Sequence, residues 1–80
     1  MRTIKQLLEL MLKHQERFET GLCLWVRMLF WLSLIKNDER KLLLDYIKEN
    51  KPENAGYLFY WEEGEIAPRI EWINQEIKKL

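Results

Sequence analysis

Arg27 is a cation within an apolar run, a combination that can bind an anion in apolar surroundings. Its neighbours at helical spacing are Cys23, Leu24, Phe30 and Trp31. An unpaired charge in such surroundings is costly, so the guanidinium must be paired or must reach water. Two interpretations stay open. Arg27 either forms a structural ion pair with a glutamate of another helix or faces a ligand pocket or subunit interface.

A second candidate site consists of Arg69 and Trp72, three residues apart, with Tyr60 and Trp61 shortly before them. We expect Arg69 in the first turn of a helix, where free backbone N–H groups and the helix dipole favour anions. With aromatic rings beside it, this arrangement suits a planar, negatively charged ligand such as a nucleotide. In the alternative interpretation, the tryptophans only cover the core and Arg69 pairs with Glu65 or Glu62.

The other polar residues do not indicate enzymatic chemistry. His14 has no evident partner for acid–base catalysis, and the single cysteine, Cys23, is not paired with a histidine in a known pattern. One histidine, one cysteine and scattered carboxylates give no spacing for a tetrahedral metal site. The three glycines are too far apart for a phosphate-binding loop. We therefore expect a binding protein without a cofactor.

Size and charge limit the possible functions further. Residues 1–80 can form one domain, and a chain this short buries only about 60–65% of its unfolded surface. One cysteine excludes an intramolecular disulfide, and charged residues interrupt positions 1–20, so we expect a cytoplasmic protein without a secretory signal. Thirteen basic and thirteen acidic residues argue against extended nucleic-acid binding. A small anion needs only two or three cations, so charge balance leaves that ligand class open.

Apolar spacing predicts an all-α domain of four helices to position these residues. The first helix is expected to begin at a capping box of Thr3 with Gln6 and to end at Gly21. The third is expected to run from about Glu39, capped by Asn37 or Asp38, to Glu49, where Asn50, Lys51 and Pro52 stop it. The third helix is expected to turn four residues inward: Leu42, Leu43, Tyr46 and Ile47. We expect residues 50–56 to form a loop. The aromatic residues 57–61 should form an extended segment or short turn packed over the helices.

The segment Leu22–Ile35 is apolar almost all the way round. As a helix it would be about 21 Å long, which is short of the roughly 30 Å hydrocarbon core of a bilayer. We therefore expect it not to span a membrane. A helix that is apolar on every side is normally surrounded by other helices, of which an 80-residue chain has few. We expect the protein to self-associate through this helix or the last one.

The last helix is expected to begin with Pro68 in its first turn. Its buried stripe is predicted from apolar residues at regular 4-3-4-3 spacing, namely Ile66, Ile70, Ile73, Ile77 and Leu80. Arg69 and Trp72 lie off this stripe, which leaves them available to a ligand.

A further set of motifs runs through most of the chain: Gly21-Leu22-Cys23, Tyr46-Ile47 with Asn50 and Pro52, Tyr60-Trp61, Gly64, Pro68-Arg69-Ile70 and Trp72-Ile73. Together they resemble a group of small uncharacterised proteins of bacteriophages and prophages. The resemblance implies an accessory phage product. Several small oligomeric proteins of that kind block host defence, either by capturing cyclic nucleotides or related signals between subunits or by binding a defence protein. No motif of the nucleotide-capturing families is present, so their pocket residues cannot be carried over.

The sequence thus predicts a self-associating accessory protein that sequesters a small anionic, nucleotide-like ligand. Its expected binding residues are Arg27, Tyr60, Trp61, Arg69 and Trp72. The alternative is an interaction module or inhibitor that binds a host protein through a face rich in tryptophan, tyrosine and arginine, the residue types that dominate interface energetics. A purely structural assembly subunit is a third possibility.

Overall fold

The computed structural model describes residues 1–15, 21–50 and 67–80. Within these ranges the chain forms helices and no strand, which confirms the all-α class. The helices are α1 (Ile4–Lys13), α2 (Leu22–Trp31), α3 (Asn37–Asn50) and α5 (Ala67–Lys79). The predicted aromatic segment, with Tyr60 and Trp61, lies outside the described residues.

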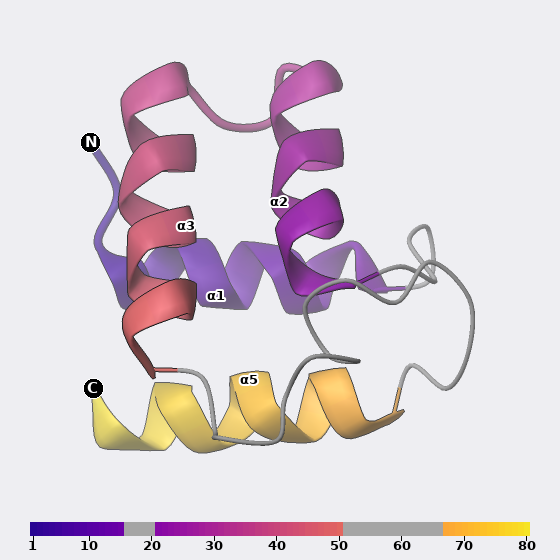
Figure 1. Ribbon diagram of the computed structural model, residues 1–80, viewed down its shortest axis with the longest axis vertical. Helices are drawn as coiled ribbons and strands as arrows, with labels where there is room; N and C mark the ends of the chain where they lie inside the picture. The colour runs from indigo at the N-terminus through magenta and orange to yellow at the C-terminus, as the bar shows by residue number, and fades with distance from the viewer. Residues whose placement is uncertain (16–20, 51–66) are drawn as a thin grey trace.

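The helices cross in two directions (Figure 1). α2 and α3 run antiparallel side by side, while α1 crosses behind them at a steep angle. α5 lies next to α1 and runs in the opposite direction, and both chain ends lie on the same side of the molecule. Because α1 contacts α2, α3 and α5, its apolar residues Leu7, Leu8 and Met11 are completely buried.

The start of α1 confirms the predicted capping box. The backbone N–H of Gln6 donates to Thr3 Oγ1 at 3.2 Å, and the backbone N–H of Thr3 donates to Gln6 Oε1 at 2.9 Å. The predicted end at Gly21 is wrong, because α1 ends at Lys13. There the N–H of the next residue, His14, donates to the Met11 carbonyl, which tightens the last turn.

α2 ends at Trp31, four residues before the predicted end at Ile35. Ser33 adopts the left-handed conformation, with φ of 61°. Its N–H donates to the Phe30 carbonyl at 2.9 Å, and the N–H of Leu34 donates to the Leu29 carbonyl at 3.0 Å. These two bonds form a Schellman motif, which reverses the chain and satisfies the last carbonyls of the helix.

The described part of the chain does not surround α2 on every side. One face, made of Leu22, Trp25, Val26 and Leu29, is completely buried. The opposite face is exposed or half-buried, so within the described chain α2 packs on one side only. Self-association remains a prediction. No helix among the described residues is long and apolar enough to cross a membrane.

α3 begins two residues earlier than predicted, at Asn37. The buried carboxylate of Glu39 explains this start, because its Oε1 accepts the backbone N–H of Lys36 at 2.9 Å. The inward face agrees with the prediction: Leu43 and Ile47 are buried, while Leu42 and Tyr46 are half-buried.

α5 turns a different face inward from the predicted isoleucine stripe. Its buried residues are Arg69, Trp72, Ile73 and Glu76, which follow the spacing of one helical face. Ile70 and Ile77 flank this face and are only half-buried, Leu80 is 53% exposed, and Ile66 lies outside the described residues. Apolar spacing could not identify this face, because two of its four buried residues, Arg69 and Glu76, are charged.

Candidate functional site

Arg69 is the most unusual residue of the described structure. It is the third residue of α5, and its side chain is only 1% exposed. Long side chains in a helix project back toward its N-terminus, where the first backbone N–H groups have no partner within the helix. The first turn of α5 contains no acidic residue to balance this positive end. The guanidinium and the helix start therefore both favour a negative group here.

The guanidinium of Arg69 lacks partners in the described part of the chain. Its buried Nε and Nη1 atoms have no hydrogen-bond acceptor there. Burial lowers the pKa of Arg69, but an arginine in a protein stays protonated. A buried cation without an anion is strongly destabilising, and buried polar atoms are nearly always satisfied. An acceptor for Arg69 is therefore required.

Glu76 does not provide that acceptor, although it is on the same buried face. It lies seven residues after Arg69, about 10 Å along the helix, and its oxygens already have partners. The Tyr46 hydroxyl donates to Oε1 at 3.1 Å, and Lys79 Nζ lies 2.7 Å from Oε2. Burial, and then the hydrogen bond to the carboxylate, raise the pKa of Tyr46. Sequence patterning missed Glu76 because nothing local distinguishes it from a surface glutamate.

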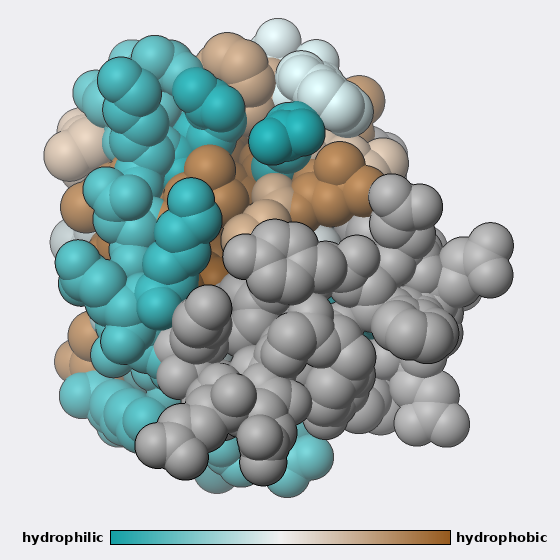
Figure 2. Space-filling view, viewed as in Figure 1, coloured by the Kyte–Doolittle hydropathy of each residue, from teal (hydrophilic) through white to brown (hydrophobic). Residues whose placement is uncertain are grey.

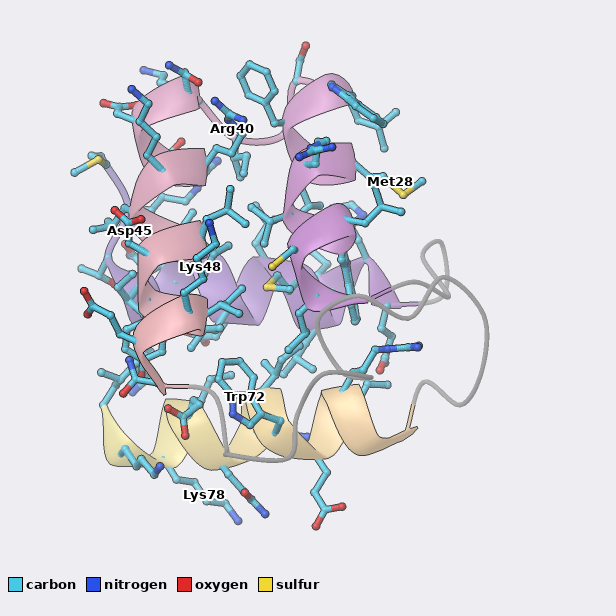
Figure 3. The ribbon with its side chains drawn as sticks, in the orientation of Figure 1. Met28, Arg40, Asp45, Lys48, Trp72 and Lys78 are labelled. Carbon is cyan, nitrogen blue, oxygen red and sulfur yellow. The ribbon has the colours of Figure 1, made fainter. Side chains whose placement is uncertain are left out.

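Trp72 is buried on the same face of α5 as Arg69. Figure 3 shows Trp72 on the inner side of the helix. It is 5% exposed and makes contacts within the protein. Trp72 is therefore part of the core, and it can serve a ligand at Arg69 only as an apolar wall. Two further predicted binding residues, Tyr60 and Trp61, lie outside the described residues.

Arg27 has very different surroundings from Arg69. It is exposed on the outward face of α2, where its guanidinium reaches water. In the described ranges, the ion pairs join Arg2 to Glu39 and Lys79 to Glu76, and neither includes Arg27. The structure thus places Arg69 and Trp72 together and Arg27 on another surface.

Glu39 is a second buried carboxylate that sequence analysis missed. It is 2% exposed and accepts backbone N–H bonds from Lys36 and Arg2, as well as the Arg2 guanidinium at 3.1 Å. The Lys36 bond lowers the pKa of Glu39, burial opposes this effect, and Arg2 adds to it. Because its oxygens are occupied, Glu39 fastens the N-terminus to α3 and offers no free acceptor.

Comparisons with models of protein families, curated proteins and solved structures find no match. Among the described residues, no group of three or more histidine, cysteine, aspartate or glutamate side chains could hold a metal ion. The candidate site therefore rests on Arg69 and its surroundings.

Proposed function

We propose that this protein sequesters a small anionic, nucleotide-like ligand at Arg69 without chemical turnover. The observation that carries the proposal is the buried guanidinium whose Nε and Nη1 have no acceptor among the described residues. An anionic ligand would supply those acceptors and would also interact favourably with the start of α5. Charged hydrogen bonds of this kind contribute about 1.5–3 kcal/mol each.

The aromatic surroundings support a nucleotide-like ligand over a simple inorganic anion. Trp72 flanks Arg69 on the buried face of α5, and Tyr60 and Trp61 precede it in the sequence. A planar base can pack against such rings while its phosphate accepts from the guanidinium. The resemblance to phage and prophage proteins supports an accessory role against host defence, in which a signal molecule is captured.

The proposal is tested with an Arg69→Met variant, which keeps the length of the side chain but removes its charge. If Arg69 awaits a ligand, the variant should melt no earlier than the ligand-free wild type, because an unpaired buried cation has been removed. Its affinity should fall about ten- to a hundredfold in calorimetric titrations with cyclic and linear nucleotides. Native mass spectrometry of the protein purified from cells would identify a retained ligand.

The matched control is Arg27→Met, which removes an exposed arginine and should leave nucleotide affinity unchanged. If Arg69 instead pairs with a glutamate of residues 62–65, Arg69→Met should melt early because it leaves a carboxylate unpaired. Early melting of that variant, together with a wild type that binds no nucleotide, would reject sequestration.

A second candidate function, binding of another protein, is supported by the open face of α2, where Trp31 is 63% exposed.

A further inference from the structure

The outward face of α2 is formed by Leu24, Arg27, Met28 and Trp31, which share one side of the helix opposite its buried stripe. Leu24 and Met28 are half-buried, while Arg27 and Trp31 are exposed. Figure 3 shows Met28 on the side of α2 away from α3. The other exposed large apolar residues are Leu32, directly after α2, and Met1 and Leu80 at the chain ends, within the described ranges. Apart from the chain ends, the exposed large apolar side chains of the described ranges are therefore Trp31, at the end of α2, and Leu32, directly after it.

The charge of this region is one-sided. Residues 21–37 contain two cations, Arg27 and Lys36, and no carboxylate, although the whole chain has thirteen charges of each sign. Figure 2 shows hydrophobic side chains over α2 beside the hydrophilic surface of α3. An apolar face with a cation near its centre is complementary to a partner that combines apolar side chains with carboxylates.

A second guanidinium lies next to this face. Arg40 of α3 is placed over the ring of Phe30, with its central carbon 5.0 Å from the ring centroid. The side-chain oxygen of Asn37 holds it there by accepting from Nε at 3.2 Å and from Nη2 at 2.8 Å. Phe30 is three residues after Arg27, so it is adjacent to Arg27 on the helix surface. Arg40 is thus a fixed cation at the rim of the face.

We infer that the outward face of α2 binds an acidic amphipathic helix of another protein. The partner's apolar stripe would pack on Leu24, Met28 and Trp31, and its carboxylates would pair with Arg27 and Arg40. Helices recognise apolar faces in this way through residues at i, i+3, i+4 and i+7. Tryptophan and arginine near the centre of a face are the residue types that contribute most to binding.

A second copy of the chain is a poorer occupant. A two-fold interface repeats the same surface on both sides, so α2 against α2 would bring both Arg27 side chains into one contact. Residues 21–37 supply no carboxylate to neutralise them. Self-association through α2, which the apolar sequence favoured, is therefore opposed by its charge.

The experiment uses the full chain and two synthetic helical peptides. Both carry leucine at i, i+3, i+4 and i+7; one has glutamate at the flanking positions, and the other has lysine. Fluorescence anisotropy should show binding of the glutamate peptide and at least tenfold weaker binding of the lysine peptide. Arg27→Glu should lower the affinity for the glutamate peptide at least tenfold and raise the affinity for the lysine peptide. The exposed control Lys48→Glu should change neither affinity by more than about twofold.

Equal binding of the two peptides, or no binding of either, would overturn the inference. So would light scattering that gives a dimer of the wild type and a monomer of Trp31→Ser, since the face would then belong to a second copy. Circular dichroism of each variant should match the wild type, because Arg27, Trp31 and Lys48 are exposed. If a variant has lost its helical signal, Met28→Lys replaces it. The inference requires that Met28→Lys also binds the glutamate peptide more weakly than the wild type.

Discussion

The hydroxyl of Tyr46 donates a hydrogen bond of 3.1 Å to Glu76 Oε1 and thereby joins α3 to α5 across thirty positions of sequence. Glu76 is 2% exposed, so this bond satisfies a carboxylate that would otherwise be buried with fewer partners. The buried face of α5 thus holds one charge with partners, Glu76, and one without a partner among the described residues, Arg69. We expect the first to stabilise the fold and the second to serve binding.

Replacing Tyr46 by Phe should lower the free energy of unfolding by about 1–3 kcal/mol, because it removes a donor from a buried carboxylate. Urea denaturation measures the change. The comparison variant is Lys79→Met, which removes the other partner of Glu76. The Lys79 side chain is 68% exposed, so its loss should change stability by less than about 1 kcal/mol. A loss well below about 1 kcal/mol for Tyr46→Phe would contradict a structural role for the tyrosine hydroxyl.

Glu39 should make the fold sensitive to acid. Its pKa in the folded protein lies below the ordinary value of 4.5, chiefly because of the Lys36 backbone N–H. The ionised carboxylate therefore stabilises the fold above that ordinary value, and the stabilisation is lost as the pH falls through the lower, folded-state pKa. Glu39→Gln should unfold more readily in urea near neutral pH and show a smaller further loss on acidification. If the stability of the variant and of the wild type changed with pH in the same way, this prediction would be contradicted.

Ile73→Asp should unfold the protein or prevent α5 from docking. Ile73 is completely buried, and an unpaired charge there should cost several kcal/mol, comparable with the whole stability of a small domain. Asn74→Asp adds the same charge at the next, exposed position and serves as the control. Circular dichroism melting of both variants makes the test. A normal melting temperature for Ile73→Asp would show that α5 does not depend on this face.

The features that could be predicted from the sequence are those set by residues close together in the chain. The Thr3–Gln6 capping box and the inward face of α3 follow from spacing within a few residues, and both are confirmed. The face of α5 could not be predicted from apolar spacing, because its partners are distant: Tyr46, which binds Glu76, is thirty residues away. The candidate site was predicted in part. The position of Arg69 at a helix start was expected, whereas its burial depends on packing between helices.

Ser33 explains the early end of α2 and gives the last prediction. A left-handed φ of 61° is unfavourable for a residue with a Cβ atom, and glycine is the usual residue at this position of a Schellman motif. Ser33→Gly should therefore raise the free energy of unfolding by about 1 kcal/mol, partly offset by the greater freedom of glycine in the unfolded chain. Ser33→Val should lower stability, because a branched side chain tolerates this conformation least. Ser33→Ala is the control and should change little. Urea denaturation should give the highest free energy of unfolding for Ser33→Gly, a lower one for Ser33→Ala and the lowest for Ser33→Val. If Val matched Gly, the left-handed turn would not be what ends the helix.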